Sequence, residues 1–200
     1  MSAAGTIGVL ALQGGFEAHE RVLRALDADI RQVRVPEDLD GLSALVLPGG
    51  ESTTMMLGIE REALAEPLAE FVRGGLPVLA TCAGVIILDD AHLGLLDVTC
   101  ERNAYGSQIK SFEADLAVAG VAGGDDVRGV FIRAPRIARL GEGVETLAEY
   151  EGSPVAVRAG PVLALTFHPE LSGDDRIHRL FLESVPQTNV SDINSKRRAA

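Results

Sequence analysis

The stretch "PVLATCAGVIIL", residues 77–88, contains two short apolar runs that meet at small residues around Cys82. The first run, "PVLAT", is typical of a buried strand, and "AGVIILDD" after it predicts a helix. A strand that passes into a helix within so few residues requires a sharp turn at Cys82. The stretch therefore predicts one strand-turn-helix unit of an α/β fold.

The same alternation repeats toward the N-terminus. Strand patterns occupy 6–12, 30–35 and 44–48, and helix patterns occupy 17–26 and 60–74. Val22, Leu23 and Leu26 mark one face of the first helix, and Pro67 marks a kink or a restart in the second. Nearly continuous apolar strands joined by helices predict a doubly wound, mostly parallel sheet with helices on both faces.

The second half of the chain changes character. Its strand patterns, separated by glycine turns, cover 98–106, 111–120, 129–135, 144–152, 153–160 and 161–169. They predict an antiparallel extension of the sheet. A helix is predicted near 174–185, where Ile177, Leu180, Phe181 and Val185 share one face. We expect one domain over residues 1–185 and a flexible tail over 186–200.

Composition and charge narrow the classes of function. The 200 residues are 46% hydrophobic and 24% charged, which fits one ordered globular domain. A net charge of −11 argues against nucleic acid and anionic membranes as partners. The basic cluster Lys196–Arg198 is interpreted as part of a solvent-exposed C-terminal segment. Two cysteines, no basic-apolar leader and no long apolar run predict a cytoplasmic protein with reduced thiols.

Three segments follow predicted strands at the edge where open α/β sheets bind ligands. They are "GGESTT" (49–54), "TCAG" (81–84) and "FHPE" (167–170). The first reads either as a phosphate cradle or as a plain turn before a helix capped by Ser52 or Thr53. It is not a P-loop, because no lysine follows the glycines.

Cys82 also has two interpretations. A free cysteine between apolar runs is often a small buried hydrophobe. A cysteine on a sharp turn at a helix N-terminus can instead serve as a nucleophile, because that position favours the attacking thiolate. Cys100, in a strand-like segment without such a turn, is expected to be core.

A thiolate nucleophile needs a base, and histidine is suited to that role. We expect His19 and His178, which lie on helix patterns, to be exposed or at helix caps, and His92 to lie in a loop without a nearby partner. His168 follows a strand, and Glu170 two residues later faces the same side and can orient the imidazole. Taken alone, this tripeptide is better explained as an ordinary surface loop.

A metal site is a further alternative for the C-terminal segment. The candidate ligands are His168, Glu170, Asp174 and His178. Asp174 and His178 are one helical turn apart. Asp174 is equally explained as a helix cap, so we predict neither a metal nor a cofactor.

With these motifs in this order, the chain resembles the triad class, or class I, of glutamine amidotransferases. The match narrows to the family of glutaminase subunits of pyridoxal 5′-phosphate synthase. It is carried by "GVLALQGG", "LPGGESTTM", "TCAGVIIL", "ERNAYGSQIKSFEADL", "GVFIRAP" and "FHPEL" and runs from about residue 6 to 185. The resemblance implies a flavodoxin-like fold and hydrolysis of L-glutamine to glutamate and ammonia.

The resemblance also implies a role for each matching residue. Cys82 is the nucleophile, His168 the acid and base, and Glu170 its orienter. The positions that match the glutamine-binding residues are Gly50, Glu51, Ser52, Arg102, Ile132 and Arg133. Backbone N–H groups of Gly50 and Ala83 form the oxyanion hole. The implied partner is a synthase subunit with a (β/α)8 barrel, in a large hetero-oligomer that receives the ammonia.

Three features depart from the family pattern. Ser107 stands where arginine is common, Ala80 where glycine is common, and the segment between Ile87 and Leu93 is short. Two other functions stay open: an amidotransferase subunit that serves another acceptor, and a redox-sensing cysteine protein of the same fold. Without the resemblance, Arg102 and Arg133 read as exposed side chains on strand edges.

Overall fold

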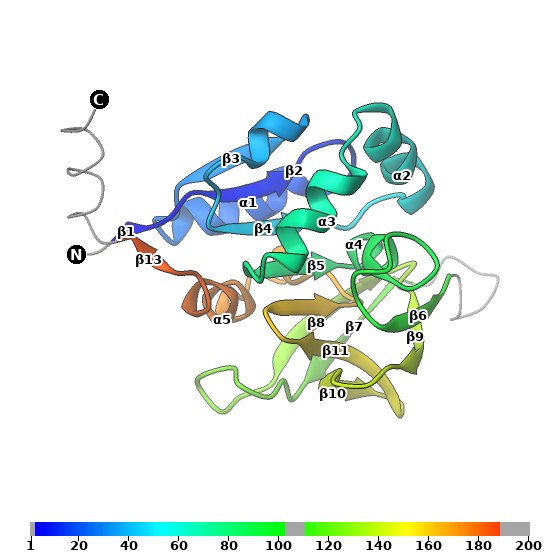
Figure 1. Cartoon of the computed structure of the whole chain (residues 1–200). Helices are drawn as coiled ribbons and strands as arrows, with labels where there is room; N and C mark the ends of the chain where they lie inside the picture. The colour runs from blue at the N-terminus through cyan, green and yellow to red at the C-terminus, as the bar shows by residue number, and fades with distance from the viewer. Residues whose placement is uncertain (1–2, 103–110, 189–200) are drawn as a thin grey trace.

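The central element of the fold is a seven-stranded sheet (Figure 1). A computed structural model describes residues 3–102 and 111–188. The strand order is β10-β11-β12-β5-β4-β2-β3. Five strands are parallel: β2 (Ile7–Leu10), β3 (Ile30–Val33), β4 (Ala44–Leu47), β5 (Val78–Thr81) and β12 (Val162–Leu165). The strands β10 (Glu145–Tyr150) and β11 (Ser153–Ala159) extend it antiparallel at one edge.

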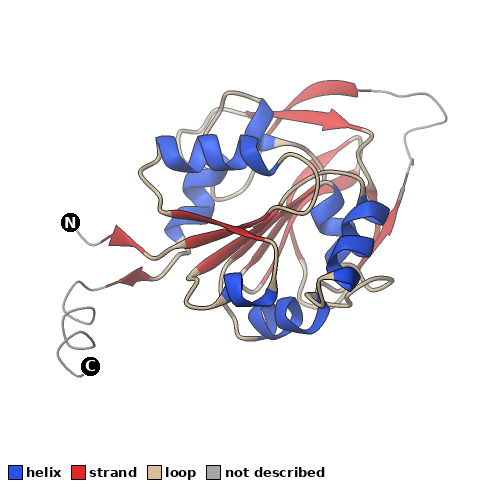
Figure 2. Ribbon diagram, turned by 90° about the horizontal axis from the view of Figure 1, so that it is seen from above, coloured by secondary structure: helices blue, strands red, loops and turns tan. Residues whose placement is uncertain are grey.

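Helices cover both faces of this sheet, as the view from above shows (Figure 2). The helices α2 (Ser52–Arg61), α3 (Ala65–Arg73) and α4 (Ala83–Leu88) pack on one face. The helices α1 (Phe16–Ala25) and α5 (Arg176–Glu183) pack on the other. The doubly wound, mostly parallel architecture with an antiparallel extension is confirmed.

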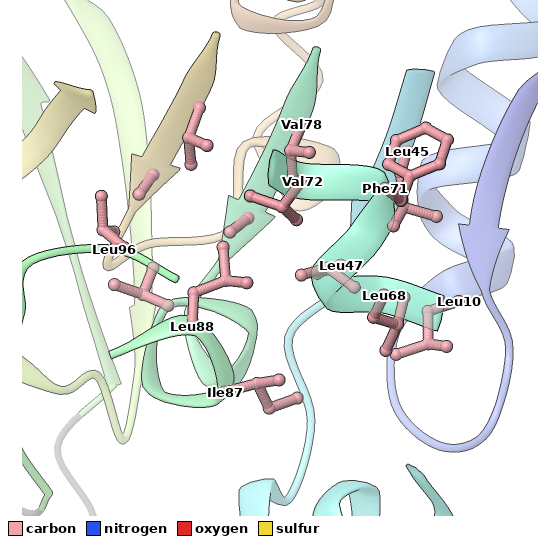
Figure 3. Packing of buried hydrophobic residues seen from close by; sticks show 14 of the residues in the cluster. Leu10, Leu45, Leu47, Leu68, Phe71, Val72, Val78, Ile87, Leu88 and Leu96 are labelled. Carbon is pink, nitrogen blue, oxygen red and sulfur yellow. The ribbon is translucent and has the colours of Figure 1, made fainter. Parts of the chain in front are cut away.

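The buried strands explain why both faces need cover. All four residues of β4 are buried, and Leu45 and Leu47 face one apolar cluster while Val46 faces the other. Figure 3 shows Leu47 near Leu68 and Leu45 near Phe71, both residues of α3. Each such side chain contributes about 1.5–3 kcal/mol when it leaves water. This packing holds the strand ends rigidly in place.

Three short strand pairs surround the sheet. They are β6 (Val98–Glu101) with β9 (Arg136–Leu140), β7 (Ser111–Leu116) with β8 (Val127–Ile132), and β1 (Ala3–Ala4) with β13 (Gln187–Thr188). The sequence patterns did not predict β9. Two short 3-10 helices complete the described elements: η1 (Pro36–Leu39) and η2 (Pro169–Leu171).

The helix predicted over 60–74 is in fact two helices, and this prediction was wrong. The chain breaks after α2, where Ala63 takes a positive φ of 54°. Pro67 lies in the first turn of α3, where a proline is tolerated, so it marks a restart. Helix α2 is capped by Glu51, not by Ser52 or Thr53, because the Glu51 carboxylate accepts the N–H groups of Thr53 and Thr54.

Some predictions concern the ends of the described ranges. Gln187 and Thr188 pair with Ala3–Ala4, so this part of the predicted tail is in a strand. Residues 189–200, which include Lys196–Arg198, lie outside the described residues, as does Ser107. In the part of the chain that is described, no helix has the length and apolar character needed to cross a bilayer.

Candidate active site

Cys82 occupies a strained turn between β5 and α4. Its φ is 47° and its ψ is −105°, a conformation that residues with a side chain seldom adopt. The turn is held on one side by the Cys82 N–H, which donates to Leu165 O of β12 at 2.8 Å. On the other side Gly84 packs so closely that an added Cβ would lie 2.2 Å from Leu47 O. The predicted elbow is therefore present, and its cysteine lines a cavity.

His168 and Glu170 meet Cys82 because β12 lies beside β5 in the sheet. His168 follows β12 after two residues, and its N–H donates to Val130 O at 2.8 Å. Its Nδ1 lies 2.7 Å from Oε1 of Glu170, whose side chain is buried. Burial lowers the pKa of His168, but hydrogen bonds with Cys82 and Glu170 outweigh it and raise the pKa to about 10. His168 is therefore an imidazolium at neutral pH.

The glycine pair after β4 packs directly against these two side chains. A Cβ at Gly49 would lie 2.3 Å from Cε1 of His168 and 3.1 Å from Cβ of Cys82. A Cβ at Gly50 would lie 2.5 Å from Oε1 of Gln13, which accepts the Glu51 N–H at 2.6 Å. Only glycine allows the β4–α2 loop to approach the site this closely.

A cavity of about 450 Å³ opens beside the thiol, a size within the range of small-molecule sites. Every residue predicted at the site contributes to its lining: Gly50, Glu51, Ser52, Cys82, Ala83, Arg102, Ile132, Arg133, His168 and Glu170. The Ile132 carbonyl lies 3.9 Å from the Cys82 sulfur. Arg133 has a positive φ of 46°, and this exposed residue also lines the cavity.

Arg102 is the second arginine of the cavity and follows β6. Its Nη1 donates to Oγ1 of Thr53 at 3.1 Å and to Oγ of Ser52 at 3.5 Å. These bonds connect the end of β6 to the start of α2, so Arg102 forms part of one wall of the cavity.

The prediction that His19 and His178 are exposed or cap residues was wrong, since both are fully buried. His19 Nδ1 lies 3.0 Å from Nε2 of His178, and His19 Nε2 lies 3.1 Å from Oγ1 of Thr81 and 3.2 Å from Oε2 of Glu170. The sequence did contain a signal, because His19 precedes Leu23 by four residues, one helical turn on the apolar face.

The remaining predicted residues lie away from the cavity. His92 has a partner after all, because its Nδ1 lies 2.7 Å from Oδ1 of Asp89. Cys100 packs against the core as expected, and burial together with Asp89 and Asp90 raises its pKa to about 12. Within the described residues no three His, Cys, Asp or Glu side chains are placed to hold a metal, and Asp174 pairs with Arg176.

A doubly wound α/β domain with a cysteine elbow, a histidine-carboxylate pair and a polar cavity at the strand ends is the arrangement of triad glutamine amidotransferases. The sequence model of the SNO glutamine amidotransferase family matches residues 9–187. The chain belongs to this family.

Relatives of known name support the assignment. A pyridoxal 5′-phosphate synthase subunit PdxT from Geobacillus kaustophilus is 48% identical over 192 residues, covering 92% of this chain and 97% of that protein. A subunit of the same name from Pelotomaculum thermopropionicum is 52% identical over 184 residues, covering 88% of this chain and 93% of that protein. A crystal structure described as a glutamine amidotransferase superposes with a TM-score of 0.83 at 47% identity, covering 88% of this chain and 97% of that one.

Proposed function

We propose that this chain is the glutaminase subunit of a pyridoxal 5′-phosphate synthase, which hydrolyses L-glutamine to L-glutamate and ammonia. One observation carries the proposal: Cys82 on its strained turn lies in the same cavity as His168 and Glu170, and Gly49 packs against both the cysteine and the imidazole. The near 50% identity to synthase subunits along most of the chain supports the choice of family reaction.

The first chemical step is attack of the Cys82 thiolate on the side-chain amide carbon of glutamine, which places a negative charge on the amide oxygen. We assign the stabilisation of this negative charge to two hydrogen-bond donors, the backbone N–H groups of Gly50 and Ala83. Ala83 is the first residue of α4, where the helix itself provides no acceptor for the N–H group. Both residues line the cavity beside the sulfur.

The second step is departure of ammonia, for which the leaving nitrogen needs a proton. His168 is its source, because a pKa near 10 keeps the imidazole charged at neutral pH. Water then attacks the thioester, and the neutral His168 accepts the proton of that water, which releases glutamate and restores the thiolate and imidazolium. Glu170 holds Nδ1 throughout and thereby keeps Nε2 directed at the reacting atoms.

The substrate-binding role falls to the residues of the cavity wall. Arg102 and Arg133 are suited to hold the carboxylate of glutamine by charge-assisted bonds, and both stand on the cavity lining. Glu51, Ser52 and Ile132 offer a carboxylate, a hydroxyl and a carbonyl on the same lining, which are acceptors suited to the substrate's ammonium group.

The partner implied by this function is the synthase subunit that receives ammonia. The relatives are named as subunits of pyridoxal 5′-phosphate synthase, so we expect a complex of two kinds of chain. A (β/α)8 barrel partner, a large hetero-oligomer and a cytoplasmic location stay predictions from the sequence.

The test is a glutaminase assay of wild type and Cys82→Ala, each with the synthase subunit present. We expect ammonia release to fall to background in the variant, because no other described residue of the cavity carries a thiol. A urea melt of the variant serves as the control for folding. Ammonia release by Cys82→Ala at the wild-type rate would refute the proposal.

A further inference from the structure

A buried histidine pair lies next to Oε2 of Glu170, the carboxylate oxygen that does not contact His168. His19 comes from α1 and His178 from α5, and both are fully buried. The mechanism above uses neither of them. Their contacts nevertheless lead into the triad, because Nε2 of His19 lies 3.2 Å from Oε2 of Glu170 and 3.1 Å from Oγ1 of Thr81.

The charges of this cluster follow from its burial. Desolvation lowers the pKa of His19, with Glu170 opposing and His168 adding to this shift. Burial and the neighbouring His19 lower the pKa of His178 to about 3, although Glu170 and Asp175 act in the opposite direction. Both imidazoles are therefore neutral at neutral pH, so each has one N–H donor and one acceptor nitrogen.

Neutrality fixes which nitrogen of each ring carries the proton. Burial raises the pKa of Glu170, but the hydrogen bond with His168 and the positive charge of that imidazolium lower it, so Glu170 is a carboxylate and can only accept. A bare Nε2 of His19 would place its lone pair against that carboxylate, so Nε2 must carry the hydrogen. Nδ1 of His19 is then the acceptor, and Nε2–H of His178 donates to it across 3.0 Å. His178 thus selects the tautomer of His19.

We propose that His19 is a positioning residue that connects the two halves of the triad. Its single Nε2–H lies between Thr81, the residue directly before Cys82, and Glu170, the residue that orients His168. Through one imidazole the nucleophile's turn and the carboxylate of the His168 pair are held at a fixed separation. The inference rests on the proposed glutaminase function, because it assigns His19 to the same reaction.

The geometry distinguishes this role from simple packing. Oε2 of Glu170 is buried and accepts no well-aligned hydrogen bond from the described residues, so the Nε2–H of His19, 3.2 Å away, is the polar group that faces its charge. An apolar side chain would fill the space of His19 but would remove that group. Oε1 of Glu170 alone would then hold the carboxylate, through His168 at 2.7 Å. A carboxylate held at one oxygen can rotate, and His168 would rotate with it.

The experiment compares two amide variants, His19→Gln and His19→Asn. The longer glutamine places its N–H near the position of Nε2, whereas the asparagine amide reaches only the position of Nδ1. Both are polar and similar in size, so they place similar demands on the core. His92→Gln is the control, because a glutamine amide does not reach the Nδ1 position and so breaks another histidine-carboxylate contact, the one at 2.7 Å between Nδ1 of His92 and Asp89, outside the cavity lining.

Two measurements are made on each variant. The first is kcat and KM for glutamine with the synthase subunit present. We expect His19→Asn to lower kcat about 100-fold, the effect of roughly 1 Å of misplacement, with KM unchanged. His19→Gln should keep kcat within about tenfold of wild type, and His92→Gln should match wild type.

The second measurement is the rate at which iodoacetamide alkylates Cys82 in the isolated chain, which requires neither glutamine nor a partner. His19→Asn should slow this rate and His19→Gln should not, since the thiolate depends on a correctly held His168. Equal rates for the two amide variants in both assays would overturn the positioning role. A wild type that releases no ammonia, with the alkylation difference present, would refute the glutaminase function alone.

Discussion

Replacement of Gly49 by alanine tests how tightly the site is packed. The new Cβ would lie 2.3 Å from Cε1 of His168, 2.9 Å from its Nδ1 and 3.1 Å from Cβ of Cys82. Carbon atoms in favourable contact are about 3.5–4.0 Å apart, so the imidazole or the loop must retreat by about 1 Å. Retreat of His168 separates it from the sulfur, and retreat of the loop moves the N–H of Gly50.

Either response misplaces a group that we assign to the reaction. We therefore expect kcat of Gly49→Ala to fall about 100-fold, because a misplacement of roughly 1 Å costs that much in rate. Overpacking should also lower the free energy of unfolding by about 1–3 kcal/mol. The assays are ammonia release with the synthase subunit present and urea unfolding followed by circular dichroism.

The matched control is Gly58→Ala, within α2. Its Cβ would approach only the Leu12 side chain, at 3.2 Å from Cδ1, and that flexible end can turn aside. The gain in helix propensity, up to about 1 kcal/mol, offsets part of the contact, so we expect wild-type kcat and nearly unchanged stability. A Gly49→Ala enzyme with wild-type kcat would refute the close-packing argument.

Two further predictions concern titration. Iodoacetamide at neutral pH should modify Cys82 and spare Cys100, because burial and nearby aspartates raise the pKa of Cys100 to about 12. Peptide mapping of the treated native chain checks this, and alkylated Cys100 would contradict it. The pKa of His178 is lowered to about 3, below the 6.5 of an unfolded chain, so the unfolded state takes up a proton first and stability is lost as pH falls below about 6.5. Between pH 7.5 and 5.5, protonation of His178 in the unfolded state should lower the free energy of unfolding by about 1.4 kcal/mol. Urea melts of wild type and His178→Asn at the two pH values measure this, and the variant should lose less stability than wild type. An equal loss in the two proteins would disprove the prediction.

Much of the fold could be predicted because its central strands are buried on both faces. The four residues of β4 and of β5 are all apolar or small. A short run of this kind that is bounded by glycine, proline or a helix pattern is best explained as a buried strand of a parallel sheet. Strand β9 was missed for the opposite reason. Of its five residues only Ile137 is buried, so "RIARL" has no alternation to detect.

Helix boundaries were harder to predict because side-chain caps compete. "GGESTT" offers a glutamate, a serine and threonines, all able to accept a backbone N–H, and only the folded loop shows that Glu51 does so. The helix predicted over 60–74 joined the last residues of α2 to α3, because the break at Ala63, with its positive φ, has no local signature in the sequence.

The triad was predicted from motif order and family resemblance, whereas its buried support was not. His19 and His178 look like surface residues because polar side chains on helices usually are. Their burial depends on pairing between helices far apart in sequence, α1 and α5, and on Glu170 lying between them and His168. No local pattern contains that information, although the spacing of His19 to Leu23 placed it on the inner face.

The place of β12 between β5 and β11 has a consequence for how the protein is made. Cys82 leaves the ribosome soon after β5, but the strand that positions His168 is the last of the sheet to be synthesised. Until β12 inserts, β5 has an open edge and the thiol has no imidazolium beside it. A chain that ends before β12 therefore has Cys82 but lacks His168 and Glu170, so the three residues can come together only when the chain is nearly complete.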